Sequence, residues 1–206
     1  LKNPAGVISG IAEILTMGET VSDEIQLIKD SSDVLLKVLD NTTALARVTL
    51  GESINMVDVN ISDLVNEVVD EFKPGFKSAG NPLNLSIESN IVQYANPIIS
   101  EVFRNYLSNA LKYAPTGEPV EVILEHKSES IEFCVRDLGN TIDGDDRDSI
   151  FKRSIQLANG KMRGSGLGLA IVKRIAEVHG AEVGVRPNQP TGNEFYLDMP
   201  LQVTEK

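Results

Sequence analysis

The chain has 206 residues, of which 41% are hydrophobic and 24% charged, a composition that suits one domain or two small ones with a packed core. The formal net charge of −11 excludes a general nucleic-acid binder, because phosphate backbones need clustered Lys and Arg. No apolar run approaches the roughly 20 residues that cross a membrane. We therefore expect no nucleic-acid partner, no membrane segment in these residues and a cytoplasmic location. The single cysteine, Cys134, lies in an apolar run and is expected to be a buried, inert thiol.

Two helical segments open the sequence. In the first, apolar residues recur at three-to-four spacing from Val7 to Leu15. After Gly18, Thr20 and Asp23 form a capping start for a second helix. The intervals between its seam positions alternate between three and four, as in a heptad repeat, at Ile25, Ile28, Ser32, Leu35, Leu39, Thr42 and Ala46. Two short helices cannot bury such a seam alone, so we expect a homodimer through residues 1–50, with two hairpins forming a four-helix bundle.

The pattern changes near Gly51, and residues 49–58 read as a linker or a short pairing segment. We place the domain boundary between residues 55 and 56. Helices are predicted from the Asn60 and Asp63 cap toward Phe76, over 97–113 and over 167–179. Strands are predicted over 83–87, 120–124, 131–136, 182–186 and 195–199. This order favours a two-layer α/β sandwich, with helices on one face of a mixed sheet.

Three short motifs have residue types that can hold a ligand. Asn105 and Asn109 lie four apart on the helix 97–113 and Lys112 follows one turn later, so the three share a stripe. These asparagines can hold a ligand or simply cap and bridge neighbouring backbone. Asp137-Leu138-Gly139 follows directly on a strand and can present a carboxylate and bare backbone to a planar ligand. Gly164-Ser165-Gly166-Leu167-Gly168-Leu169 opens a helix, where backbone amides can approach an anion.

Together, and in this order, the motifs resemble those of two-component sensor histidine kinases. Residues 105–115 resemble the N box of that family, 137–139 its G1 box, Ile150-Phe151 its F box and 164–171 its G2 box. Leu1-Lys2-Asn3-Pro4 resembles the tail of the H box, whose pattern places the phosphate-accepting histidine two residues before Leu1. The resemblance covers nearly the whole chain. It implies an α-helical hairpin over 1–55, paired as a dimeric four-helix bundle, followed over 56–206 by an α+β two-layer sandwich of the histidine kinase ATPase type (Bergerat fold).

The function that this resemblance implies is ATP-dependent phosphorylation of a protein histidine, followed by transfer to an aspartate on a response-regulator receiver domain. ATP and Mg²⁺ are the implied cofactors, with Asn109 as the metal ligand. Asn105 would position the nucleotide and the attacking group. Related ATPases carry Glu at the position of Asn105, and since an amide cannot act as a general base, phosphate is expected to pass to histidine rather than to water. Asn3 matches the position associated with phosphatase activity, or it caps the helix that contains Pro4.

The resemblance also implies which residues surround the nucleotide. Asp137 would accept a hydrogen bond from the adenine amino group, Gly139 would permit close approach and Tyr113 would pack near the base. Lys161 and Arg163 lie in the implied lid, where they reach the γ-phosphate or are merely solvated. The full implied nucleotide-binding set is Asn105, Asn109, Lys112, Tyr113, Asp137, Gly139, Ile142, Lys161, Arg163, Gly164, Ser165, Gly166, Leu167, Gly168 and Leu169.

The chain departs from the family pattern at three positions. Thr141 replaces the second glycine of the G1 box, and Ser154 and Gln156 replace the aromatic residue and the arginine after the F box. We expect these changes to affect lid closure and rate more than nucleotide binding. They keep open a non-enzymatic phosphotransfer or scaffold module, while an ATP-hydrolysing switch is opposed by Asn105. His126 and His179 lack H-box context and are interpreted as structural.

Overall fold

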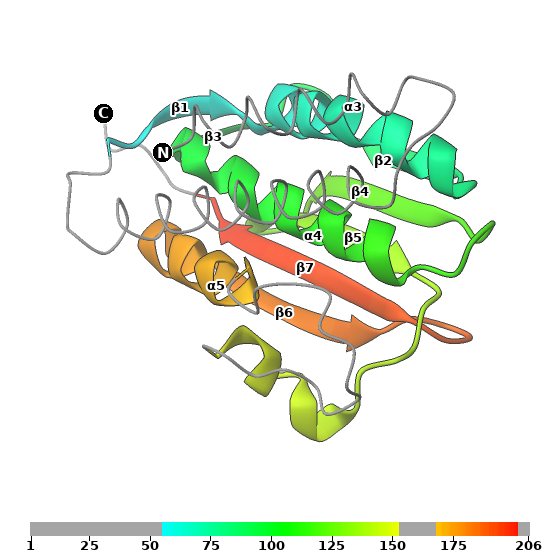
Figure 1. The fold of residues 1–206 in the computed structure, drawn as a ribbon. Coiled ribbons are helices and arrows are strands. Elements are labelled where there is room, and N and C mark those ends of the chain that lie inside the picture. The colour runs from blue at the N-terminus through cyan, green and yellow to red at the C-terminus, as the bar shows by residue number, and fades with distance from the viewer. Residues whose placement is uncertain (1–54, 153–167, 202–206) are drawn as a thin grey trace, which may run out of the picture.

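A computed structural model of the protein describes residues 55–152 and 168–201. In these ranges, three α-helices lie along one face of a five-stranded sheet (Figure 1). The helices are α3 (Ile61–Ala79), α4 (Ser100–Tyr113) and α5 (Gly168–His179), and the strands are β2 (Leu83–Ile87), β4 (Val120–His126), β5 (Ser130–Asp137), β6 (Glu182–Pro187) and β7 (Asn193–Pro200). The predicted sandwich is confirmed. The predicted hairpin of residues 1–50 lies outside the described ranges.

The sheet is mixed, as expected. Its strand order is β2-β4-β5-β7-β6, in which β2 and β4 run parallel and the other neighbours run antiparallel. A separate ribbon pairs β1 (Val57–Asn60) with β3 (Val92–Ala95) in antiparallel register. The sequence analysis did not predict β3. Short 3-10 turns complete the fold at η1 (Pro97–Ile99), η2 (Gly144–Asp146) and η3 (Ser149–Phe151), so the helix predicted over 97–113 begins with η1 and becomes α-helical at Ser100.

Local capping residues set the helix ends. The Asn60 side chain accepts a hydrogen bond of 3.2 Å from the Asp63 amide at the start of α3. Gly80, with φ of 74°, ends that helix three residues beyond the predicted limit at Phe76. At the start of η1, Asn96 accepts a hydrogen bond of 3.0 Å from the Ile98 amide. Among the helices in the described ranges, none is long and apolar enough to cross a membrane.

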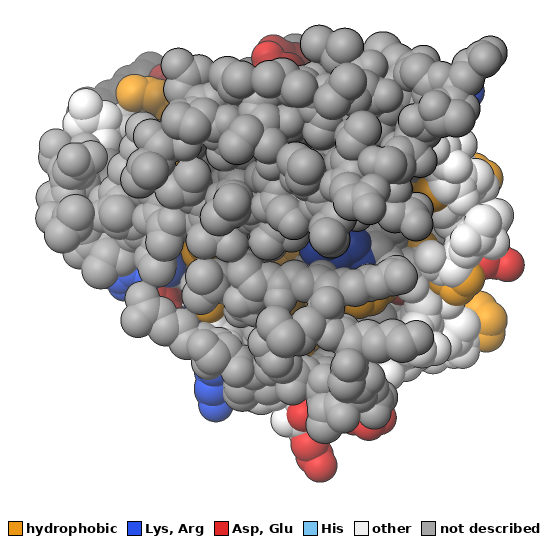
Figure 2. Space-filling view, in the orientation of Figure 1, with side chains coloured by type: hydrophobic (Ala, Val, Ile, Leu, Met, Phe, Trp, Pro, Cys, Tyr) orange, Lys and Arg blue, Asp and Glu red, His pale blue; other side chains and the backbone are white. Residues whose placement is uncertain are grey.

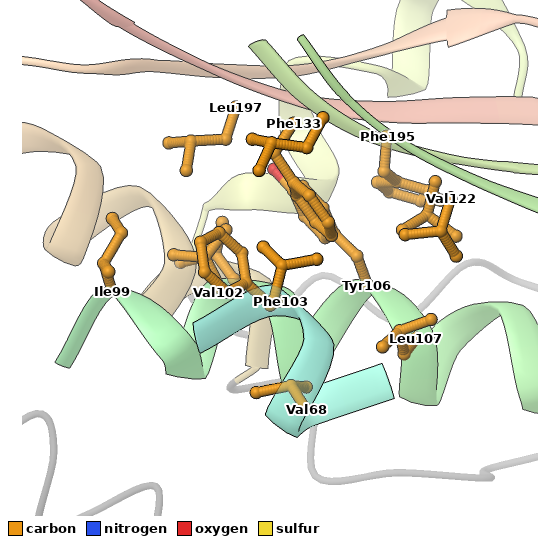
Figure 3. Close-up of a cluster of buried hydrophobic side chains, with 14 of the residues drawn as sticks. Val68, Ile99, Val102, Phe103, Tyr106, Leu107, Val122, Phe133, Phe195 and Leu197 are labelled. Atoms are coloured by element: carbon orange, nitrogen blue, oxygen red, sulfur yellow. The ribbon is translucent and has the colours of Figure 1, made fainter. Parts of the chain in front are cut away.

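The hydrophobic core lies between the helices and the sheet. Tyr106 points from α4 toward Phe133 of β5 and Phe195 of β7 (Figure 3), with ring centroids 6.2 Å and 5.5 Å away. Its hydroxyl donates a hydrogen bond of 2.8 Å to the Tyr196 carbonyl. Phe103, one turn earlier, packs on Phe133 at 4.5 Å between centroids. Because α4 is fixed to the sheet by these aromatic side chains, its polar stripe is held at a defined place beside β5.

The opposite face of the sheet carries paired charges. Arg186 contacts Glu132 at 2.9 Å and Glu194 at 2.7 Å, and it stacks on the Tyr196 ring at 4.2 Å. Cys134 lies on β5 and is 1% exposed. Burial raises the pKa of its thiol to about 12, so the prediction of a buried and unreactive cysteine is confirmed.

Candidate nucleotide-binding site

Asp137 ends β5 in a buried position. It follows a strand that is paired on both sides, by β4 and β7, and it is 2% exposed. Burial raises the pKa of this carboxyl, while hydrogen bonds from Gly139 and Asn193 lower it again. The Gly139 amide donates to Asp137 Oδ1 at 2.8 Å. An ionised carboxylate has about four acceptor positions, so Asp137 can accept a further hydrogen bond from a ligand beside those from Gly139 and Asn193.

Gly139 joins the G1 segment to the end of α4. A Cβ atom at this position would lie 2.6 Å from the Tyr113 carbonyl oxygen and 2.9 Å from Asp137 Oδ1. Both distances are too short for a side chain to fit, and the nearer atom is backbone that cannot move aside. A glycine is required because the chain is held between the end of the N box and the Asp137 carboxylate.

Asn105 joins α4 to the start of α5. Its side chain is largely buried, and its Nδ2 donates to the Glu101 carbonyl at 3.4 Å. A Cβ atom at Gly168 would lie 2.2 Å from Asn105 Oδ1, so the last glycine of the G2 motif packs directly on the first asparagine of the N box. This contact also brings the positive end of α5 beside the amide of Asn105.

The predicted site residues on α4 become more exposed toward the C-terminal end of the helix. Asn105 is buried, Asn109 is half-buried and Lys112 is exposed, and Tyr113 has 58% of its surface accessible. Mg²⁺ in nucleotide sites takes one or two protein oxygens together with phosphate and water, so the single amide oxygen of Asn109 fits the predicted metal role. A cation at Lys112 and an aromatic face at Tyr113 suit a phosphate and a base at the surface end.

Two asparagines that the sequence analysis missed support the loops of this site. Asn81 is 5% exposed, and its Nδ2 donates to the carbonyls of Pro115 at 2.6 Å and Glu118 at 2.7 Å, directly after α4. Asn193, also 5% exposed, accepts from the Ile142 amide at 2.8 Å and donates to the Asn140 carbonyl at 2.9 Å. These partners lie 34 to 53 residues away in the chain, so no local pattern marks them.

The other predicted site residues divide into two groups. Ile142 and Leu169 are half-buried and pack against the core. Asn3, Lys161, Arg163, Gly164, Ser165, Gly166 and Leu167 lie outside the described residues, as do the departures at Ser154 and Gln156. The acidic segment around η2 exposes Asp143, Asp145 and Asp148 to solvent, and Figure 2 shows acidic side chains at the lower edge of the molecule in this region.

Neither described histidine lies in the site. His126 is exposed and contacts Glu88 at 2.9 Å. His179 is buried, with Nδ1 at 2.7 Å from the Ile175 carbonyl and Nε2 at 3.0 Å from the Asn96 amide. These contacts agree with the structural roles predicted for both.

The chain is similar to named sensor kinases. The chain is 29% identical over 212 residues to the sensor-like histidine kinase SenX3 of Mycobacterium tuberculosis, an alignment of 98% of this chain and 52% of SenX3. It is 28% identical to the autoinducer 2 sensor kinase/phosphatase LuxQ of Vibrio vulnificus, over 100% of this chain and 26% of LuxQ. The chain thus spans about half the length of the first relative and about a quarter of the second.

A solved structure shares the fold. The structure of full-length ShkA in complex with AMPPNP matches 98% of this chain and 44% of ShkA, with a TM-score of 0.73 and 23% sequence identity. The family described as histidine kinase-, DNA gyrase B- and HSP90-like ATPases matches residues 94–203, which is more than half of the chain and includes Asn105, Asp137 and Gly168. With its N-box, G1 and G2 segments joined by direct contacts, the chain belongs to this ATPase family.

Proposed function

We propose that the chain binds Mg²⁺-ATP at this site and transfers the γ-phosphate to a histidine of its own protein, from which an aspartate of a response-regulator receiver domain receives it. The observation that carries the proposal is the meeting of the three motifs. Gly139 lies against Tyr113 at the C-terminal end of α4, and Gly168 lies against Asn105 nearer its start, so two segments far apart in sequence both contact this helix. The likeness to sensor kinases supports the same conclusion.

The described residues would each contact a different part of Mg²⁺-ATP. Asp137 would accept a hydrogen bond from the adenine amino group, Gly139 would keep this segment close to Tyr113, and Tyr113 would pack near the base. Lys112 would contact phosphate. Asn109 would hold Mg²⁺, which supplies charge neutralisation on the phosphates. In phosphoryl transfer, positioning and charge neutralisation provide most of the rate acceleration, so a site without a strong base is adequate.

Asn105 favours a protein acceptor over water. A carboxylate at this position can remove a proton from water, whereas the amide of Asn105 cannot. An imidazole needs no such base, because its unprotonated nitrogen attacks phosphorus directly. The new bond joins nitrogen to phosphorus, the bond from phosphorus to the bridging oxygen breaks, and ADP leaves. The proton on the other ring nitrogen then passes to solvent, which leaves a neutral phosphorylated ring.

The acceptor and the phosphatase role rest on the H-box pattern. That pattern puts the histidine two residues before Leu1 and puts Asn3 four residues after it. The name of the relative LuxQ, autoinducer 2 sensor kinase/phosphatase, gives both activities to one protein, which supports a phosphatase role beside the kinase role. We include in the proposal dimerisation through residues 1–50, a cytoplasmic location for this part of the protein and a phosphatase role for Asn3.

The test is incubation with ATP that carries a radioactive label in its γ-phosphate. The chain extended with its native upstream residues should label itself, and the label should be lost in acid and kept in base, as for a phosphoramidate. Asn109→Ala should abolish labelling because it removes the proposed metal ligand. The 206-residue chain without the extension should bind ATP yet remain unlabelled.

Two outcomes would contradict the proposal. Strong labelling of the 206-residue chain at His126 or His179 would show that the H-box alignment is wrong. An extended chain that binds ATP but never labels would favour the non-enzymatic phosphotransfer or scaffold module, with Thr141, Ser154 and Gln156 as the marks of an impaired kinase.

A further inference from the structure

Thr141, which departs from the family pattern, takes part in a chain of hydrogen bonds to the β6–β7 turn. The Gly192 amide donates to Thr141 Oγ1 at 2.9 Å. Thr141 Oγ1 lies 3.4 Å from Thr191 Oγ1, and Thr191 Oγ1 donates to the Gly139 carbonyl at 3.2 Å. Because the Thr191 proton is used on Gly139, Thr141 must be the donor between the two hydroxyls. Each hydroxyl therefore accepts one hydrogen bond and donates one.

The same turn also holds the backbone of Asp137. Asn188 Nδ2 donates to the Asp137 carbonyl at 3.0 Å. Gly192 packs so closely that a Cβ atom there would lie 2.0 Å from the Asp137 carbonyl oxygen, and its φ of 104° is one that side chains rarely adopt. The turn thus contacts the polypeptide at Asp137 and at two positions that follow it, Gly139 and Thr141.

We propose that Thr141 is a positioning residue that, through Thr191 and Gly192, fixes the direction in which Asp137 presents its carboxylate, and so sets the preference of the site for adenine. This inference rests on the proposed binding of ATP. A glycine at position 141 would leave the segment free to shift, whereas the threonine ties it to a turn that is itself packed on Asp137.

A directional contact of this kind has a specific consequence for ligand choice. Adenine offers an amino group to Asp137, whereas hypoxanthine offers a carbonyl oxygen in the same place. A well-aligned carboxylate accepts from the first and repels the second. Loss of the Thr141 hydrogen bonds should therefore weaken ATP binding. Binding of inosine triphosphate should be nearly unchanged, because hypoxanthine has no amino group to donate to the aligned Asp137 carboxylate.

The experiment measures dissociation constants of ATP and inosine triphosphate, with Mg²⁺, for the 206-residue chain. Thr141→Val keeps the shape and removes the hydroxyl, and Thr191→Val breaks the same chain of hydrogen bonds at its other hydroxyl. Each should weaken ATP binding by about three- to tenfold, in line with the loss of a hydrogen bond. Thr141→Ser should restore the wild-type ratio of the two constants. Thr116→Val, an exposed threonine in the turn after α4, is the matched control and should match wild type.

Three results would overturn the inference. The wild-type ratio persisting in both valine variants would show that the hydroxyls do not align Asp137. An equal loss for both nucleotides, together with a lower thermal unfolding midpoint, would show a merely structural role. Failure of the wild-type chain to bind ATP would overturn the proposed function and this inference with it, whereas the first two results leave ATP binding standing.

Discussion

The ionised carboxylate of Asp137 opposes folding but suits the proposed ligand. Burial raises its pKa above the value in the unfolded chain, and the hydrogen bonds from Gly139 and Asn193 offset this only in part. At neutral pH the charged group therefore lowers the free energy of unfolding. This cost disappears as the pH falls through the raised folded-state pKa, since the folded protein then takes up a proton more readily than the unfolded chain does.

Asp137→Asn should separate stability from binding. The amide keeps an oxygen for the Gly139 amide and removes the buried charge, so the ligand-free variant should unfold at a higher urea concentration than wild type. ATP binding should weaken about 10- to 100-fold, because a hydrogen bond to a charged acceptor is lost. In wild type, ATP affinity should decline on acidification with a midpoint above the usual aspartate value, measured by calorimetry between neutral pH and pH 4.

The control for this variant is Asp58→Asn, which removes the same charge at an exposed position on β1. It should change neither the urea midpoint nor the ATP affinity. A destabilised Asp137→Asn chain would mean that the carboxylate contributes favourable interactions that outweigh the cost of its burial. Unchanged ATP affinity would remove Asp137 from base recognition.

At the scale of elements, the helix ends and strands that depend on residues close together in the chain were predicted from the sequence. The Asn60 cap and Gly80 enclose α3, and the predicted strands agree with β2, β4, β5, β6 and β7 to within a few residues. β3 was missed because four residues with alternate exposure give too short a signal. Asn105, Asp137 and Gly168 were found through the spacing of motifs. Asn81 and Asn193 were missed because their hydrogen-bond partners are remote in sequence and are brought near only by the folded sheet.

His179 links the end of α5 to the start of the N-box helix. Its ring donates from Nδ1 to the Ile175 carbonyl and accepts at Nε2 from the Asn96 amide, while the Asn96 side chain caps η1 and donates to the Asn55 carbonyl at 2.8 Å. Three segments thus meet at one buried histidine. The tautomer with the proton on Nδ1 follows from these partners, because Nε2 must accept.

His179→Ala should lower the free energy of unfolding by about 2–4 kcal/mol, since it leaves a cavity and two backbone groups without partners. Urea unfolding followed by circular dichroism measures this. His126→Ala is the matched control, because that histidine is exposed and its pairing with Glu88 is a surface contact. The control should lose far less stability. Equal effects for the two variants would mean that the Asn96–His179 contact contributes nothing measurable.

At the scale of the whole molecule, the described residues 55–152 and 168–201 pack around one hydrophobic core. The helices α3, α4 and α5 bury their apolar faces against the sheet and one another, and the core residues lie between Ile61 and Met199. The apolar seam of residues 25–46 has a different periodicity, and we predict that it packs separately from this core. Nucleotide binding and association are therefore expected to depend on separate parts of the chain.

This separation can be tested by placing charge in the seam. Replacing Leu35 and Leu39 by Glu would bury carboxylates between the predicted helices at a cost of several kcal/mol, so the variant should be monomeric by light scattering, whereas we expect wild type to be a dimer. Glu at positions 37 and 44, which fall opposite the seam in the heptad, is the matched control and should leave the dimer intact. Both double variants should bind ATP with wild-type affinity, because Asp137 and the N box lie outside residues 1–50. A dimer that persists in the seam variant would place the interface elsewhere, and a seam variant that no longer binds ATP would show that the two units depend on each other.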